Sequence, residues 1–382
     1  MRVLIACGGT GGHIFPGLSL AQELQARGIN EVLLLGTDHP LEVKLFGSFG
    51  LPYRLMPVAK LSANPVKFLR FLVSFLRACL RSAKLLFEYK PDIVVGFGGY
   101  ASFPICKFAA LMGKPLFLHE QNCEAGLANR ILALLARRVA VSFKETQKAF
   151  GRKAVFTGNP IRKRLLTAKR EEALKLYKLS PDKFTVLVLG GSQGSQRINT
   201  IVGDMLGILS EEEKKQISII HIAGMKNIDD VRKKYERIGK FPSPLSSPQG
   251  GEGRVRGEKN SGIDACVYDF VEDIGAAYAA ADLIVSRAGA TALFEIAALG
   301  IPSIMIPYRF ACGHQYHNAA ALERVGGTIV MDEVGLTPTA LKEKIFELRN
   351  DRARLDRLSE CAKKFAVPDA ASRLADLIIG QK

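Results

Sequence analysis

Short apolar runs alternate with helix-like stretches along the whole chain. The runs are mostly continuous Val, Ile and Leu segments, which is the pattern of parallel strands buried on both faces of a sheet. Strands that alternate with helices indicate an α/β fold with parallel sheets. The predicted strands are Arg2–Cys7, Glu31–Leu35, Asp92–Val95, Leu116–His119, Arg138–Ser142, Ala154–Phe156, Phe184–Gly190, Ile217–Ala223, Ala265–Tyr268, Asp282–Ser286, Ser303–Ile306 and Thr328–Met331.

The predicted strands fall into two series, which indicates two similar halves. A turn-forming and then basic segment, Gly158–Arg164, separates them, so we expect a first domain over residues 1–160 and a second over 161–354. Residues 242–262 include 12 Pro, Gly or Ser among 21. Such a long segment without structure is uncommon in a compact domain, so we expect a disordered surface insertion, with a functional lid as the alternative.

The composition limits the class of protein. Hydrophobic residues make up 48% and charged residues 24%, as in a globular enzyme, and 53 Lys+Arg against 37 Asp+Glu give a net charge of +16 that favours phosphate-bearing partners. The 7 cysteines contain no C-x-x-C pair, so a reducing cytosol is the simplest compartment. No apolar run reaches the roughly 18 residues of a spanning helix, so we expect a soluble or peripheral protein.

Three glycine-rich turns each follow a predicted strand and precede a predicted helix. They are Gly8–His13, Gly96–Tyr100 and Gly190–Ser195. Glycine lets the backbone approach a ligand closely, and the helix start behind it offers free N–H groups, so these turns suit a pyrophosphate or a sugar hydroxyl. The alternative for any one of them is a tight turn without a ligand.

The second of these turns also fits a relaxed dinucleotide-binding pattern. Gly96, Gly98 and Ala101 have the spacing, and Glu120 ends the next predicted strand. The match lies on a later strand rather than the first, and no residues suited to hydride transfer accompany it. A nicotinamide site therefore stays open as an alternative.

Polar clusters follow several predicted strands, at the edge where open α/β sheets bind ligands. His13 ends the first glycine turn, and His119–Asn122 ends a later strand. In the second half, Ser286–Thr291 leads into an apolar helix with one carboxylate, Glu295, which is either a helix-start charge or a ligand to sugar hydroxyls. His314–Asn318 opens another helix. The spacings predict no metal site, because His314 and His317 lack a third ligand nearby.

Residues 66–88 form a basic amphipathic pattern. On a helical wheel Lys67, Arg70, Arg77, Arg81 and Lys84 fall within an arc of about 100°, and Leu and Phe residues fill much of the remainder. An apolar face bordered by Lys and Arg is typical of an anionic-membrane contact. A core helix with a solvated stripe, and nucleic-acid binding, are the alternatives.

Taken in order, these motifs resemble one family: the peptidoglycan N-acetylglucosaminyltransferases that make lipid II from lipid I. The resemblance rests on Gly8–Pro16 (GGTGGHIFP), Gly96–Tyr100 (GFGGY), His119–Asn122 (HEQN), Gly158–Arg162 (GNPIR), Gly190–Gly194 (GGSQG), Asp269–Ile274 (DFVEDI), Ser286–Glu295 and His314–Ala319 (HQYHNA). It covers nearly the whole chain except residues 242–262.

The resemblance implies a GT-B architecture, in which two Rossmann-like doubly wound domains face each other across a cleft and the C-terminal segment 355–382 returns to the first domain. It implies no cofactor and no metal. Glycine turns of the first domain would face the acceptor pyrophosphate, with Gly98, Gly99 and Tyr100 as the contacts. The UDP-N-acetylglucosamine donor would be held by Arg162, Ser192, Val271 (through its backbone), Gly289, Ala290, Thr291, Ala292, Leu293, Phe294, Glu295 and Gln315, and reached by Thr10, Gly11, Gly12 and Asn122.

Three positions and one segment depart from the family pattern. Ala292 stands where the family usually has Thr, Gly313 stands where an acidic residue usually precedes His-Gln, and Ala125 replaces a common Pro after HEQN. The insertion at 242–262 has no expected counterpart. We expect these changes to alter individual contacts but not the class of reaction.

By the same resemblance, the reaction transfers N-acetylglucosamine from UDP to the 4-hydroxyl of the muramyl sugar with inversion. A general base near that hydroxyl is expected, and His13 is the first candidate because imidazole titrates near neutral pH. Glu120 is the second and His119 the third.

Because the acceptor is a membrane lipid, we expect the 66–88 helix to dock the protein peripherally on the cytoplasmic face of the cell membrane. No nucleic-acid partner is expected. Another UDP-sugar enzyme of the same architecture, such as a lipid glycosyltransferase or an epimerase, remains an alternative, as does an NAD-dependent oxidoreductase.

Overall fold

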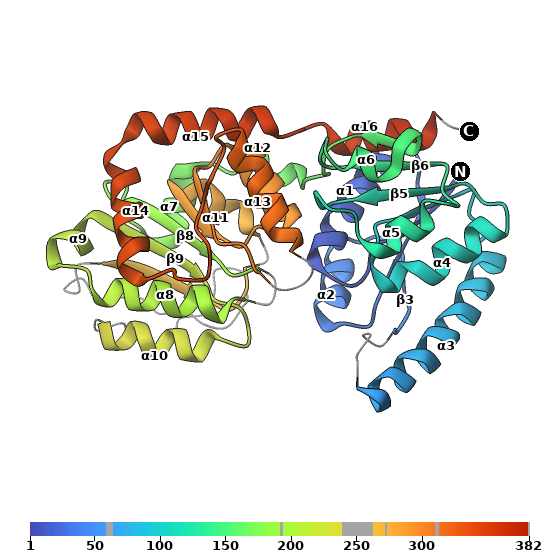
Figure 1. Ribbon diagram of the computed structural model, residues 1–382, viewed down its shortest axis with the longest axis horizontal. Helices are drawn as coiled ribbons and strands as arrows, with labels where there is room; N and C mark the ends of the chain where they lie inside the picture. Colours follow the sequence, from blue (N-terminus) through green and yellow to red (C-terminus); the bar gives the residue numbers. More distant parts are fainter. Residues whose placement is uncertain (59–63, 192–193, 239–262, 272, 310–312, 381–382) are drawn as a thin grey trace. The chain divides into compact units, whose positions relative to one another are not determined.

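The computed structural model describes residues 1–58, 64–191, 194–238, 263–271, 273–309 and 313–380. The predicted insertion at 242–262 and the predicted donor ligand Ser192 therefore lie outside the described residues. The chain divides into two compact units (Figure 1). Unit 1 comprises Met1–Arg162 and Val367–Lys382, and unit 2 comprises Lys163–Ala366.

The described part of unit 1 is built on a seven-stranded sheet in the order β3-β2-β1-β4-β5-β6-β7, with every neighbouring pair parallel. Its strands are β1 (Arg2–Ala6), β2 (Glu31–Gly36), β3 (Tyr53–Leu55), β4 (Ile93–Gly96), β5 (Leu116–Glu120), β6 (Arg138–Val141) and β7 (Ala154–Phe156). Its helices are α1 (Gly11–Ala26), α2 (Pro40–Ser48), α3 (Pro65–Tyr89), α4 (Gly99–Leu111), α5 (Leu127–Leu132), α6 (Gln147–Phe150), the short 3-10 turn η1 (Gly151–Lys153) and α16 (Ala370–Ile379).

Helices cover both faces of this sheet, because successive residues of each strand point to opposite sides. In β1, Val3 and Ile5 pack against α1, α2 and α16, whereas Leu4 and Ala6 pack against α3, α4 and α5. Burial on both faces explains the continuous apolar runs of the sequence. Figure 1 shows α16, at the red end of the chain, beside α1.

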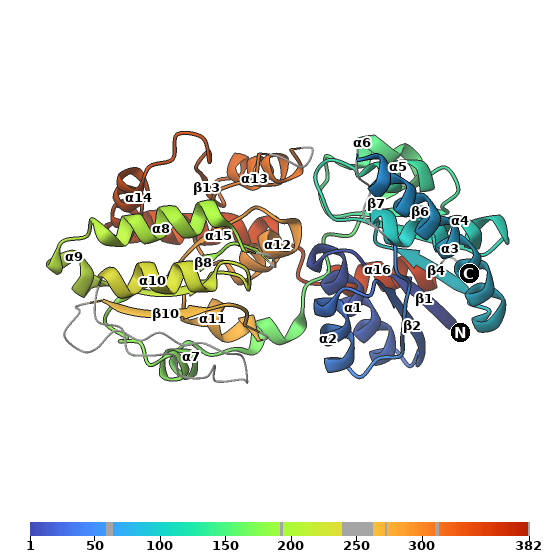
Figure 2. The same ribbon diagram turned by 90° about the horizontal axis from the view of Figure 1, so that it is seen from below.

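Unit 2 repeats this plan with a six-stranded parallel sheet, β10-β9-β8-β11-β12-β13, within its described residues. The strands are β8 (Phe184–Leu189), β9 (Ile217–Ile222), β10 (Asp264–Tyr268), β11 (Leu283–Ser286), β12 (Ser303–Met305) and β13 (Ile329–Val330). The helices are the 3-10 turn η2 (Lys163–Thr167), α7 (Arg170–Tyr177), α8 (Gln196–Gly207), α9 (Glu211–Gln216), α10 (Ile228–Ile238), α11 (Ile274–Ala280), α12 (Ala290–Leu299), α13 (His314–Arg324), α14 (Pro338–Asn350) and α15 (Arg352–Phe365). In Figure 2, α8 and α10 lie side by side.

The strands predicted from the sequence agree with the observed ones. Each of the twelve predicted strands overlaps an observed one, and β3 is an additional edge strand. Its three residues, Tyr53, Arg54 and Leu55, are only partly buried or exposed, so they form no apolar run. No helix of the described ranges is long and apolar enough to cross a membrane.

The start of α1 differs from the expectation. Pro16 and Gly28 at its two ends predict a helix over Gly17–Arg27, but α1 begins at Gly11 and contains Pro16. Its first turn is therefore the glycine-rich segment itself. The same arrangement recurs in α4, which begins at Gly99 and contains Pro104. Both glycine turns thus present the first backbone N–H groups of a helix.

The boundaries of the two units also differ from those expected. The first segment of unit 1 runs to Arg162 rather than to residue 160, and the chain rejoins unit 1 at Val367 rather than at residue 355. Helix α15 stays in unit 2 because it packs against α12 and α14, and α16 makes the return to α1. Val367 itself lies against Gly158, where a Cβ atom would come within 2.4 Å of the valine Cβ.

Candidate functional site

Two glycine turns of unit 1 lie side by side at the carboxyl edge of its sheet. Strands β1 and β4 are neighbours, and the connections from them run in opposite directions, to β2 on one side and to β5 on the other. This reversal is the position at which open α/β sheets bind ligands. The helices α1 and α4 begin there, so two helix N-termini with their positive dipole ends meet at one place. An anionic group such as a pyrophosphate suits this arrangement.

His13 lies between these two turns, on the first turn of α1. A Cβ atom at Gly99 would lie 3.1 Å from His13 Cε1, and one at Gly9 would lie 3.8 Å from Nδ1. Nδ1 is buried. Burial lowers the pKa of His13, and the carboxylate of Glu120, a hydrogen bond with the backbone of Gly8 and the carboxylate of Glu42 oppose that shift. The ring is therefore a neutral imidazole at physiological pH, which is the form that accepts a proton.

Gly98 and Gly99 have backbone conformations that favour glycine, with φ of +86° and +79°. Ser102 fixes the turn, since its hydroxyl donates a hydrogen bond to the carbonyl of Gly98 at 2.5 Å. The neighbouring Tyr100 is partly buried, and burial raises the pKa of its phenol. Thr10, which precedes α1, is exposed, and its side chain makes no capping hydrogen bond.

Glu120, at the end of β5, holds the segment that follows it. Its Oε1 accepts hydrogen bonds from Asn122 N at 3.0 Å and Asn122 Nδ2 at 3.3 Å. Its Oε2 accepts from Gly126 N at 3.0 Å and Asn129 Nδ2 at 2.8 Å. Both carboxylate oxygens thus accept hydrogen bonds from this loop, and Glu120 is only 2% exposed. The arrangement suits a positioning role better than the predicted role as base.

His119 is fully buried, and both of its ring nitrogens have partners. The Gln121 side-chain amide donates to Nδ1 at 3.0 Å, so Nε2 carries the proton and donates to the carbonyl of Gly158 at 3.1 Å. Burial lowers the pKa of His119 to about 4. A satisfied neutral imidazole inside the sheet connects β5 to the Gly158 turn and is not available to a substrate. Of the three predicted bases, His13 is the one that lies between the two helix N-termini.

Two residues that the motifs did not single out hold this part of unit 1 together. Glu42 accepts hydrogen bonds from Gly9 N at 2.8 Å and from Thr37 N at 2.6 Å, which ties α2 to the first glycine turn. Asn129 on α5 donates to Glu120 and lies against Gly98, where a Cβ atom would come within 3.0 Å of its Nδ2. A lone carboxylate or amide on a helix carries no local signal, so sequence reasoning could not find them.

The third glycine turn leads from β8 into α8 in unit 2. Its backbone is packed closely: a Cβ atom at Gly190 would lie 2.3 Å from Ser195 N, and one at Gly194 would lie 2.2 Å from the carbonyl oxygen of Ala223. Ser195 caps α8 by accepting a hydrogen bond from Ile198 N. The turn therefore needs glycine for packing as well as for any ligand.

The second unit has its own switch point, between β8 and β11. Gly289 precedes α12, so the N–H groups of Ala290, Thr291 and Ala292 lie in the first turn of that helix. Asn318 of α13 is fully buried and donates to the carbonyl of Ala288 at 3.1 Å, which holds this turn against α13. Such a helix start suits the phosphates of a nucleotide.

Farther along α12 the predicted residues divide into two groups. Leu293 and Phe294 are buried, and the Phe294 ring stacks on Phe365 with the centroids 5.6 Å apart. Their side chains belong to the core. Glu295 is a buried carboxylate, and the hydroxyl of Tyr278 on α11 donates to its Oε2 at 3.3 Å. Tyr278 is a further residue that no motif indicated.

The remaining predicted donor residues are spread over both units. Gln315 lies in the first turn of α13, and its Oε1 accepts a hydrogen bond from Tyr308 N at 3.0 Å. Val271 follows β10 and is partly buried. Arg162 ends the first segment of unit 1, where its guanidinium carbon lies 4.1 Å from the centroid of the Phe15 ring, a cation–π contact.

Comparison with known proteins decides the family. The profile of the glycosyltransferase family 28 N-terminal domain matches residues 3–141, and that of the glycosyltransferase family 28 C-terminal domain matches residues 185–374. This chain belongs to glycosyltransferase family 28. The motif resemblance and the two Rossmann-like domains of the GT-B class are thereby confirmed.

Relatives within family 28 match over the full chain. The UDP-N-acetylglucosamine--N-acetylmuramyl-(pentapeptide) pyrophosphoryl-undecaprenol N-acetylglucosamine transferase of Halothermothrix orenii is 38% identical and covers 99% of this chain and 98% of its own length. The transferase of the same name from Geobacter metallireducens is also 38% identical, over 100% of this chain and 99% of its own. The chain is a UDP-N-acetylglucosamine-dependent hexosyltransferase.

Solved structures agree with this placement. The crystal structure of Acinetobacter baumannii MurG has a TM-score of 0.71 at 26% identity, with all of both chains covered. A UDP-GlcNAc 2-epimerase from Neisseria meningitidis reaches a TM-score of 0.69 over all of both chains at only 13% identity. That second likeness concerns the fold alone.

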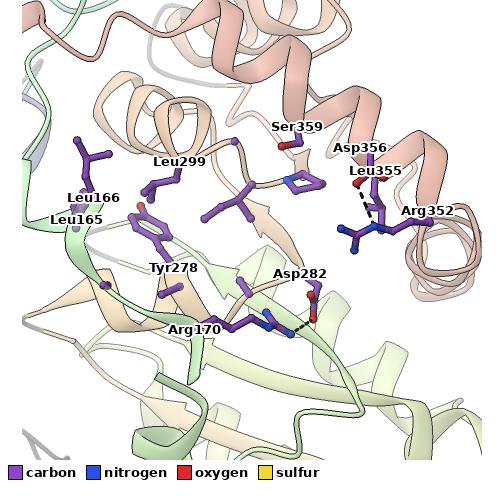
Figure 3. Close-up of a pocket in the computed structure, with 16 residues that line it drawn as sticks. Leu165, Leu166, Arg170, Tyr278, Asp282, Leu299, Arg352, Leu355, Asp356 and Ser359 are labelled. Carbon is purple, nitrogen blue, oxygen red and sulfur yellow. Dashed lines mark hydrogen bonds and ion pairs between the residues drawn. The ribbon is translucent and has the colours of Figure 1, made fainter. Parts of the chain in front are cut away.

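A cavity of about 350 Å³ opens on unit 2 (Figure 3). Asp282 and Pro302 line it, just before β11 and β12 begin, so it lies at the amino edge of the sheet. Arg170 pairs with Asp282 there at 2.9 Å, and Tyr278 forms part of the wall. Ligands of open α/β sheets bind at the carboxyl edge, so this cavity opens at the edge opposite the candidate donor site, and Tyr278 in its wall donates to Glu295.

Proposed function

We propose that this chain transfers N-acetylglucosamine from UDP-N-acetylglucosamine to the 4-hydroxyl of the muramyl sugar of lipid I, with inversion, giving lipid II. The observation that carries the proposal is the full-length match to transferases named for this donor and this acceptor. The geometry of unit 1 supports it independently, because two helix N-termini and a partly buried imidazole meet at one sheet edge.

Unit 1 binds the acceptor in this proposal. The acceptor pyrophosphate lies at the Gly98–Tyr100 turn, where the first N–H groups of α4 stabilise its negative charge. His13 then takes the proton from the 4-hydroxyl as that oxygen bonds to C1 of N-acetylglucosamine. The bond from C1 to the UDP oxygen breaks in the same step, and UDP leaves with the electron pair. Glu120 and His119 hold the surrounding loops instead of acting as bases.

Unit 2 binds the donor. The diphosphate lies at the N-terminus of α12, where backbone N–H groups stabilise the charge that develops on the leaving group. Ala292 contributes only its backbone there, because it has no hydroxyl. Glu295 accepts hydrogen bonds from hydroxyls of the donor, and Gln315 is a second polar contact. Arg162, Val271 and the Gly190 turn complete the proposed set, with Thr10, Gly11, Gly12 and Asn122 as donor contacts from unit 1.

Helix α3 supplies the proposed membrane contact on the cytoplasmic face. Its exposed apolar side chains follow helical spacing on one face: Leu69, Leu72, Val73, Leu76, Leu80 and Phe87. The buried residues Ala78 and Leu86 lie on the opposite side, against the sheet. Exposed Arg70, Arg77 and Arg81 flank the apolar stripe. An apolar stripe bordered by arginines favours insertion at an anionic lipid surface.

The test is a turnover assay with UDP-N-acetylglucosamine and a lipid I analogue in detergent. UDP release that depends on the acceptor is expected. UDP release, or a change of the donor, without any acceptor would point instead to a hydrolase or an epimerase of the same fold.

A further inference from the structure

Helix α5 carries an exposed apolar stripe that α3 does not account for. Leu127 is 73% exposed and Leu134 is 78% exposed, and Ile131 and Leu135 are each 46% exposed. The four positions have spacings of three and four residues, so they share one side of the helix and of the helical turn that follows it. On the opposite side Asn129 and Leu132 are buried.

The buried side of α5 lies directly against the proposed acceptor turn. Asn129 Nδ2 is within 3.0 Å of where a Cβ atom would stand on Gly98, and it donates to Glu120 Oε2 at 2.8 Å. Lys153 fixes the far end of the helix by donating to the carbonyls of Ala133 and Leu134 at 2.8 and 2.9 Å. The helix is therefore anchored at both ends, with Leu127 at the end nearest the pyrophosphate turn and Leu134 and Leu135 at the other end.

The chemistry of the acceptor explains an apolar surface at this place. A pyrophosphoryl-undecaprenol carries its prenyl chain on the pyrophosphate, so the first isoprene units must leave the site next to the groups that bind that pyrophosphate. Exposure of four neighbouring apolar side chains to water is unfavourable in free energy, and a bound apolar ligand would remove that exposure. Exposed Arg130, whose Nε donates to the carbonyl of Ala125 at the start of the helix, suits the anionic end of the same molecule.

Resting on the proposed function, we infer that the stripe formed by Leu127, Ile131, Leu134 and Leu135 binds the pyrophosphate-proximal part of the acceptor's prenyl chain. It is a lipid-recognition subsite of the acceptor site. The α3 stripe, by contrast, contacts the bilayer.

Two soluble acceptors test this inference in detergent-free buffer without any membrane. Both are muramyl-pentapeptide pyrophosphates, one with a short prenyl tail and one capped with a methyl group. The variant is L127Q/I131Q/L134Q, and the matched control is L69Q/L76Q/L80Q on α3. Gln keeps the size and the helix propensity of Leu, and all the changed positions are exposed, so folding is retained.

The α5 variant is expected to lose about tenfold in kcat/KM with the prenyl acceptor, since a few methylene groups of burial are worth that much. Its kcat/KM with the methyl-capped acceptor stays at the wild-type value. The α3 control keeps wild-type kcat/KM with both acceptors but loses affinity for anionic vesicles.

Two results would overturn the inference alone. One is a wild-type enzyme that uses both acceptors equally well. The other is an α5 variant with unchanged kcat/KM on the prenyl acceptor and weaker vesicle binding, which would assign the stripe to the bilayer. A wild-type enzyme that transfers to neither acceptor would instead overturn the proposed function, and this inference with it.

Discussion

The imidazole of His13 packs against the backbone of Gly99, so that a single methyl group at Gly99 would lie 3.1 Å from Cε1 and 3.3 Å from Nδ1 of the ring. Through this contact the second glycine turn fixes the position of a side chain supplied by the first. The candidate acceptor site therefore needs both glycine turns of unit 1.

Gly99→Ala tests that contact. The new Cβ displaces His13, so we expect kcat to fall by at least about tenfold. The backbone at Gly99 has φ of +79°, so some stability is lost as well, about 1 kcal/mol. Gly113→Ala is the matched control, because Gly113 has φ of +73° and no heavy atom within 4 Å of the added carbon. Equal kcat values for the two variants, measured in the acceptor-dependent assay, would show that the His13 contact is unimportant.

His13→Ala removes the proposed base. We expect kcat to fall by about 10²- to 10⁴-fold while the dissociation constant for UDP-N-acetylglucosamine, measured by calorimetry, stays unchanged. A turnover number near that of the wild type would exclude His13 as the base.

The pH profile of the wild type provides a second check on His13. Burial lowers its pKa, so the ring stays unprotonated until the pH falls below the ordinary histidine value of 6.5. The acidic limb of kcat/KM should therefore have its midpoint below pH 6.5. The same shift makes protonation oppose folding, because the unfolded chain binds the proton more tightly than the native one. A limb centred above pH 7 would contradict the assignment.

The sequence predicted most reliably the strands that are buried on both faces of a sheet. Each predicted strand was found because a strand covered on both faces is a continuous apolar run, and the edge strand β3 was missed because Tyr53–Leu55 is only partly covered. The glycine turns were found from their spacing, but the start of α1 was misplaced, because Gly11 and Gly12 look like a loop until the structure shows them in a helix.

The roles of residues that act through tertiary contacts could not be predicted from the sequence. His119 looked like a possible base, and only the contacts with Gln121 and Gly158 show that both of its nitrogens are occupied. Glu42 and Asn129 act on turns that are distant in sequence, so no local pattern marks them.

Tyr278→Phe tests how Glu295 is positioned. Without the phenolic hydroxyl the carboxylate loses a hydrogen bond, so we expect KM for UDP-N-acetylglucosamine to rise about fivefold with kcat nearly unchanged. Tyr235→Phe is the control, because that buried hydroxyl contacts His221 Nδ1 at 2.9 Å, and His221 is not one of the predicted donor residues. A similar rise of KM in both variants would indicate a general effect of stability.

Reversing Arg70, Arg77 and Arg81 to Glu tests the membrane role of α3. Each basic residue near an anionic surface is worth about 1 kcal/mol, so affinity for anionic vesicles should fall by more than about a hundredfold. A matched reversal of Lys215, Lys233 and Arg237, which are exposed on unit 2, changes the net charge equally. Vesicle sedimentation that responds alike to both triple variants, or to neither, would refute α3 as the docking element.

The central claim is tested most directly by analysis of the product. Purified protein is incubated with UDP-N-acetylglucosamine and a lipid I analogue, and the product is examined by mass spectrometry and proton NMR. We expect one added N-acetylglucosamine, joined to the muramyl 4-oxygen in the β configuration that inversion requires. An α linkage, attachment at another position, or an unmodified acceptor with consumed donor would contradict the account.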